Sequence, residues 1–173
     1  MDGYSKFLDL AKNLGATHAK IIKTSTIVTA AWVYWKCKFG CPYLNSSLCC
    51  PPNTPTYRET RELLDCFEDA MLIQVIIDPN DEKPVNLTDV VTSIERDLFL
   101  NGYYKVFSMG AGCCQYCGDN CSHTECRQPA KARPLIEACG IDVYSTVRNN
   151  GLTIDVLHDY SDKITLCGLI LIE

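Results

Sequence analysis

Several features that would assign a chain quickly to a common class of protein are missing from this sequence. No apolar run approaches the roughly 20 residues that a helix needs to cross a bilayer. The start, MDGYSKFLDLAKNLG, has neither the basic stretch nor the apolar stretch of a signal peptide. We therefore expect no membrane insertion and a cytoplasmic location, where cysteines stay reduced and serve metal or redox chemistry.

Basic residues are also in the minority. Sixteen lysines and arginines stand against 21 aspartates and glutamates, which gives a net charge of −5. Because a nucleic-acid binder normally shows a basic excess or stripe, no nucleic-acid partner is expected. There is no Ser/His/Asp arrangement, and the segment GAG at 110–112 is too short for a nucleotide-binding fingerprint. The sequence therefore indicates neither a serine hydrolase nor a nucleotide-binding site.

Cysteine, by contrast, is abundant, with twelve in 173 residues, and the densest group lies between Gly110 and Arg133. Several thiolates that lie this close together in a sequence are typical ligands of iron–sulfur clusters or zinc. The spacing is close to the C-x2-C-x2-C run of bacterial ferredoxins, which predicts a [4Fe–4S] cluster with zinc as the alternative. The candidate ligands, spaced x2, x3 and x4, are Cys114, Cys117, Cys121 and Cys126.

Two other side chains in this loop are weaker candidates. Cys113 is adjacent to Cys114, so we expect it to point away from whatever Cys114 binds and to fill buried space. His123 lies inside the loop but not at the position that a zinc knuckle requires. Neither is included in the predicted ligand set.

An earlier loop holds a second candidate site, formed by Cys37, Cys41 and Cys50 with x3 and x8 spacing. Three thiolates would leave one iron of a [4Fe–4S] cluster open to a substrate or a sulfur species. If Cys49 or Cys66 closed the site, it would instead be an electron relay. A zinc or disulfide staple is the remaining alternative, and the sequence alone does not choose among these.

The order of apolar segments predicts an α/β fold, with a mixed, mostly parallel sheet, helices packed on it and the cysteine-rich loops at one edge. We expect a single domain over 1–173, with both loops leaving a strand and entering a helix. Helices are expected at 7–14, 55–67, 86–101, 129–140 and 145–150. Strands are expected within 19–35, around a turn at 24–26, and at 71–77, 103–107, 141–144 and 164–172.

Side chains beside the cysteine loops have ordinary explanations at this stage. Trp32, Tyr34 and Trp35 are expected in the core of the sheet, in preference to shielding a cluster. Five cations flank the loops, and solvated charges at the loop edges are favoured over a surface for an acidic partner. They are Lys36, Lys38, Arg127, Lys131 and Arg133.

Three segments resemble a known family. They are KCKFGCPYLNSSLCCPPNTPTYRETRELL, IERDLFLNGYYKVFSMGAGCCQYCGDNC and CRQPAKARPLIEACGIDVYSTVRNNGL, and they are similar to the predicted metal-binding proteins called domain of unknown function 2284. The resemblance covers about 19–173 and implies a cysteine-rich cytosolic protein of anaerobes that binds an iron–sulfur cluster or another metal. It implies the same seven ligands: Cys37, Cys41, Cys50, Cys114, Cys117, Cys121 and Cys126.

These observations lead to one expected function and two alternatives. The expected function is an iron–sulfur protein with two [4Fe–4S] clusters that transfers electrons to a redox partner protein or a larger complex. One alternative is an enzyme that uses an open-site cluster on a sulfur-containing or other small substrate. The other is a structural zinc-binding module. Assembly into a homo-oligomer stays open.

Overall fold

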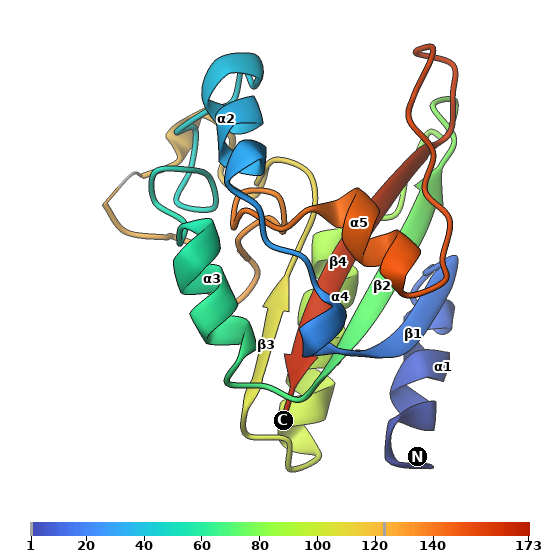
Figure 1. Cartoon of the computed structure of the whole chain (residues 1–173). Helices are drawn as coiled ribbons and strands as arrows, with labels where there is room; N and C mark the ends of the chain where they lie inside the picture. The colour runs from blue at the N-terminus through green and yellow to red at the C-terminus, as the bar shows by residue number, and fades with distance from the viewer. Residues whose placement is uncertain (1, 123) are drawn as a thin grey trace.

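The computed structural model describes residues 2–122 and 124–173 and is built around a four-stranded sheet with helices on both faces (Figure 1). The strand order across the sheet is β1 (His18–Lys23), β2 (Asp69–Ile77), β4 (Ile164–Ile172) and β3 (Val106–Met109). The α-helices are α1 (Ser5–Asn13), α2 (Ala31–Gly40), α3 (Tyr57–Leu64), α4 (Leu87–Leu100) and α5 (Val143–Asn149). Short 3-10 turns occur at Asp2–Tyr4, Thr24–Thr26 and Gly118–Asn120.

Every pair of neighbouring strands is antiparallel, so the prediction of a mostly parallel sheet is wrong. The reason lies in the β2–α4–β3 unit. Its two strands run in the same direction, as in a parallel crossover, but they do not touch. The last strand, β4, lies between them and runs against both. An alternation of strands and helices is thus compatible with a purely antiparallel sheet when a later strand fills the gap.

The long apolar runs of β2 and β4 are explained by burial on both faces of the sheet. On one face, Met71 and Ile170 pack with α1 and α4. On the other face, Leu72 and Leu169 pack with α3 and α5. Continuous apolar strands are typical of parallel sheets because helices cover both of their faces. Here helices cover both faces of an antiparallel sheet. The apolar pattern therefore indicates burial on both faces, but it does not indicate strand direction.

Several predicted elements are confirmed. Asn86 caps α4, because its side-chain oxygen accepts hydrogen bonds from the amides of Thr88 and Asp89. Gly15 and Gly102 follow α1 and α4 with φ of +98° and +99°, the left-handed region that favours glycine after a helix. Strands β2 and β4 and helix α3 lie where the apolar periodicity places them.

Other predicted elements are wrong. The segment Ala31–Gly40 is helix α2, not a strand, so the first cysteine loop leaves a helix. No helix spans 129–140, where the chain forms turns, and the expected strand at 141–144 is reduced to a single bridge between Ile141 and Thr29. Helix α5 begins at Val143, because the Asp142 carboxylate accepts a hydrogen bond from the Ser145 amide.

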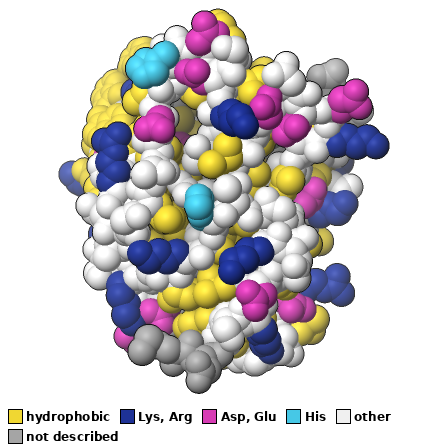
Figure 2. Space-filling view, turned by 90° about the vertical axis from the view of Figure 1, so that its right-hand side faces the viewer, with side chains coloured by type: hydrophobic (Ala, Val, Ile, Leu, Met, Phe, Trp, Pro, Cys, Tyr) yellow, Lys and Arg dark blue, Asp and Glu magenta, His cyan; other side chains and the backbone are white. Residues whose placement is uncertain are grey.

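The surface that presents the α1 side of the molecule is polar. Figure 2 shows lysines, arginines and carboxylates interspersed on this face, without a large patch of one sign. Among the residues that the structure describes, the helices are too short or too polar for any of them to cross a membrane.

Candidate metal centre

The two cysteine loops meet at one end of the molecule, beside α2 (Figure 1). Backbone hydrogen bonds bring the flanking segments together. Gly110, just after β3, donates from its amide to the Pro134 carbonyl at 2.9 Å and accepts from the Ile136 amide at 3.1 Å. The hydroxyl of Thr54, at the end of the first loop, donates to the Ala138 carbonyl at 2.7 Å. Both loops are therefore fixed to the same segment, 134–138.

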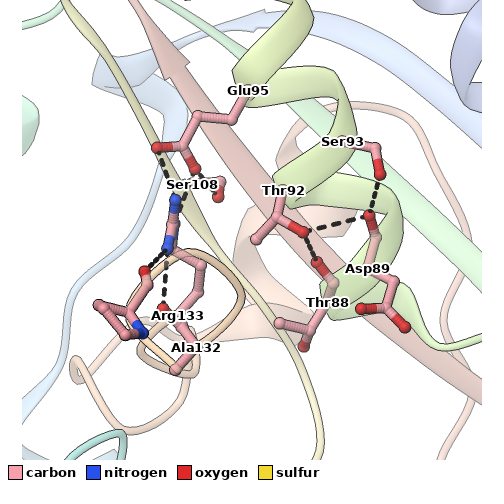
Figure 3. A network of polar contacts seen from close by, with 9 residues as sticks. Thr88, Asp89, Thr92, Ser93, Glu95, Ser108, Ala132 and Arg133 are labelled. Atoms are coloured by element: carbon pink, nitrogen blue, oxygen red, sulfur yellow. Dashed lines mark hydrogen bonds and ion pairs between the residues drawn. The ribbon is translucent and has the colours of Figure 1, made fainter. Parts of the chain in front are cut away.

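The second cysteine loop (113–126) is also held against α4. Near its start, the Tyr116 hydroxyl donates to an Asp89 carboxylate oxygen at 2.7 Å. Beyond its end, Arg133 makes a bidentate ion pair with Glu95, at 2.8 and 3.1 Å, and Ser108 on β3 donates to the same carboxylate (Figure 3). Helix α4 thus anchors the loop at two places, between Cys114 and Cys117 and beyond Cys126.

One set of thiols, called here the first thiol group, gathers beside the C-terminal end of α2. Cys37 lies in the last turn of α2, Cys41 caps that helix, and the buried Cys50 follows in the loop. The thiol of Cys113, from the other loop, is within electrostatic range of all three. The first thiol group is therefore Cys37, Cys41, Cys50 and Cys113, with the half-buried Glu137 beside it.

The second thiol group is formed within the second loop and consists of Cys114, Cys117, Cys121 and Cys126, all within electrostatic range of Cys121. The first loop reaches this group as well. Leu48 lies close enough to Cys121 for its backbone to affect that thiol. The buried Cys49 lies beside Cys114 and in electrostatic range of Cys126. Each loop thus contributes thiols to both groups.

Burial favours the protonated form of four thiols in the two loops. Burial, followed by repulsion from Cys41, raises the pKa of Cys37, and burial is also the main cause of the raised pKa of Cys113 and Cys121. Burial together with Cys114 raises the pKa of Cys49 to about 12. A metal that binds thiolates must therefore displace protons here, as is general for cysteine sites.

The structure shows where each predicted ligand cysteine lies. The seven cysteines divide between the two groups as the two loops suggested, and Cys113, expected to be a filler, lies with the first group. Cys66 is exposed and far along α3 from this end, while Cys139 and Cys167 are buried in the core. His123 lies outside the described residues. The only sequence feature that points to Cys49 and Cys113 as part of these groups is that each directly precedes a predicted ligand, Cys50 or Cys114.

The aromatic side chains before the first loop do not form a sheet core, which corrects that expectation. Trp32, Trp35 and Phe39 lie on the surface of α2, with exposed fractions of 46%, 54% and 75%. They line a shallow groove of about 890 Å³ that also exposes Cys37 and Cys41.

Arg133, expected to be a solvated charge, is instead the partner of Glu95. Of the other flanking cations, Lys131 lies 5.9 Å from the centre of the Tyr116 ring. Lys36 and Lys38 lie over Trp32 and Trp35, each 5.3 Å from the ring centre.

The donor chemistry fits a metal centre. All twelve cysteines are free, and eight of them form two groups of four thiols, the type of donor that zinc and iron–sulfur clusters select. In the described part of the chain, no three His, Cys, Asp or Glu side chains converge closely enough to hold a single ion. The sulfurs are gathered within electrostatic range of one another without forming such a geometry.

The fold and this donor set together define a cysteine-rich metal-binding protein. The comparison with known families agrees: the family described as predicted metal-binding protein (DUF2284) matches residues 20–172. The chain belongs to this family. No curated protein and no solved structure matches it.

Proposed function

We propose that this protein binds two iron–sulfur clusters of the [4Fe–4S] type and transfers electrons to a partner protein. The observation that carries the proposal is the pair of adjoining thiol groups, each composed of sulfur donors alone. Sulfur-only donor sets hold such clusters, which supply one-electron redox chemistry when bound. Two clusters side by side would form a relay for electrons.

The residues of this chain would hold the clusters and adjust their potentials. Cys114, Cys117, Cys121 and Cys126 are the ligands of one site, and Cys37, Cys41 and Cys50 belong to the other. Hydrogen bonds to ligand sulfurs raise the potential of a cluster because they stabilise the more reduced, more negative state. One such donor is the Ser47 hydroxyl, which donates to the Cys50 sulfur at 3.7 Å.

Metal and sulfide analysis of anoxically purified protein tests the cluster assignment. Two [4Fe–4S] clusters correspond to about eight iron and about eight acid-labile sulfide per chain. Reduction should give an electron paramagnetic resonance spectrum broadened by interaction between two nearby paramagnets. Stoichiometric zinc in a colourless protein would overturn the assignment and support the structural zinc module instead.

The surface of α2 is where we place the partner. Its exposed aromatic side chains border Cys37 and Cys41 in the same groove, so electrons leaving there would cross little protein. Lys36 and Lys38 lie on this surface and make no ion pair with any described residue. The charge of this surface complements an acidic partner, as it does for electrostatically steered encounters.

Reversing these two charges should slow electron transfer from an acidic donor. With reduced plant-type ferredoxin as the probe, we expect Lys36→Glu with Lys38→Glu to lower the reduction rate about tenfold and to flatten its salt dependence. Lys12→Glu on α1 is the matched control and should change little. Equal rates for all variants, or no reduction by ferredoxin of a protein that dithionite reduces, would overturn the acidic-partner assignment.

A further inference from the structure

Cys113 is not needed by the site that its own loop forms. The second thiol group already contains four cysteines, and Cys113 is absent from the neighbours of Cys121. Instead its electrostatic neighbours are, in order of strength, Cys50, Cys41 and Cys37, all from the first loop, followed by Glu137. Cys113 lines a cavity with apolar side chains such as Leu135, but it also lies in electrostatic range of three thiols of the first loop, which a filler would not require.

The backbone explains why two consecutive cysteines serve different groups. Both the amide and the carbonyl of Gly110 are paired with the 134–136 segment, so the chain leaves β3 in a fixed direction. Gly112 then turns the chain with φ of +74°. Past this turn, Cys113 lies in electrostatic range of the first thiol group, and Cys114 lies beside Cys49. The position of Cys113 is thus set by the main chain.

The first loop contains the mirror image of this arrangement. Cys49 and Cys50 are also consecutive, and Cys50 contacts the first thiol group while Cys49 contacts the second. The two pairs therefore lie against each other, each divided between the two groups. Cys49 adds a fifth thiol to a set that is complete, whereas Cys113 adds the fourth to a set that has only three.

We propose that Cys113 is the fourth thiolate ligand of the first site, so that this site has no open metal position. The inference rests on the proposed function for the identity of the metal, but it concerns ligand number and holds for zinc as well. It removes the basis for an enzyme with an open iron. It also makes Cys113 and Cys114 a bonded bridge between the two sites.

Substitution of Cys113 by alanine tests the ligand directly. In anoxic protein with both sites filled, Cys113→Ala should leave the first site with three protein ligands. Mild oxidation should then release about one of the roughly eight irons and give the resonance of a three-iron cluster at about one spin per chain. Wild type should retain all of its iron under the same treatment. The spectrum of the second site serves as an internal check that the variant folds.

Matched variants separate a ligand from a neighbour. Cys49→Ala removes the other buried thiol between the sites, and Cys66→Ser removes an exposed one; both should behave as wild type. Wild-type behaviour of Cys113→Ala, or a three-iron signal in Cys49→Ala instead, would overturn the proposal. If the wild-type protein carries zinc, the iron–sulfur assignment is wrong, but the role of Cys113 as a ligand can still be tested by measuring the zinc content of the variants. Cys113→Ala should then lose one of two ions on mild chelation, and retention of both ions would overturn the proposal.

Discussion

Replacing Cys117 with serine should remove about half of the bound metal and leave the first site filled. Replacing Cys50 with serine should do the reverse. The reason is that each thiol belongs to one group only, and a cluster that lacks one of its thiolates is lost or converted. Metal and sulfide content per chain, with the resonance spectrum of the remaining site, measures the effect in both variants.

The exposed thiol provides the control for this pair. Cys66 follows the C-terminal end of α3 and belongs to neither thiol group, so Cys66→Ser should retain all of the metal. Loss of all metal from both Cys117→Ser and Cys50→Ser would contradict independent sites and indicate a single shared centre. Equal metal in both variants and wild type would show that these thiols are not ligands.

Local patterns in the sequence predicted the elements whose stability is local. Helix α4 has an apolar stripe, a capping asparagine and a terminal glycine, and the sequence predicts it nearly to the residue. The aromatic segment before Cys37 was misassigned because Trp and Val favour strands when half buried. In the structure, that segment is a largely exposed helix with Val33 buried, and it begins beside Gly140, whose carbonyl accepts from the Ala30 amide.

The direction of the strands could not be predicted, because it depends on pairing between distant segments. Thr165 of β4 lies opposite Ile76 of β2, a pairing that no pattern in either strand specifies. A continuous apolar run indicates that a strand is buried on both faces, but it does not indicate the direction of the neighbouring strands. Here helices cover both faces of an antiparallel sheet.

The candidate site was predictable only where its ligands are close in the sequence. The second thiol group lies within thirteen residues, so spacing alone indicates it. The sequence predicted that Cys113 points away from Cys114, but it does not show which residues lie near Cys113. That depends on a first loop more than sixty residues earlier, whose Cys50, Cys41 and Cys37 lie in electrostatic range of Cys113.

Glu95→Gln should destabilise the protein strongly and act first on the second site. Glu95 and Arg133 are only 14% and 17% exposed, and the guanidinium also donates to the carbonyls of Pro129 and Ala132 (Figure 3). Removing one charge of a buried pair leaves the other without compensation and costs about 3 kcal/mol. For a chain of this size, that lowers Tm by roughly 6–12 °C. Anoxic thermal unfolding of the metal-loaded protein measures it.

A double-mutant cycle shows whether the pair itself is responsible. Adding Arg133→Met to Glu95→Gln removes the orphaned charge, so the double variant should recover part of the lost Tm. The matched control is Asp65→Asn, which removes the carboxylate of an exposed pair and leaves the bonds from Arg61 to the Ile27 and Thr24 carbonyls in place. Arg61 pairs with Asp65 on the surface of α3, where the carboxylate is 66% exposed, and such pairs contribute about 0–1 kcal/mol. Because Arg133 fixes the exit of the second loop, Glu95→Gln should release metal from that site first on chelation. Equal release from both sites would mean that the ion pair stabilises the fold as a whole and does not anchor the loop.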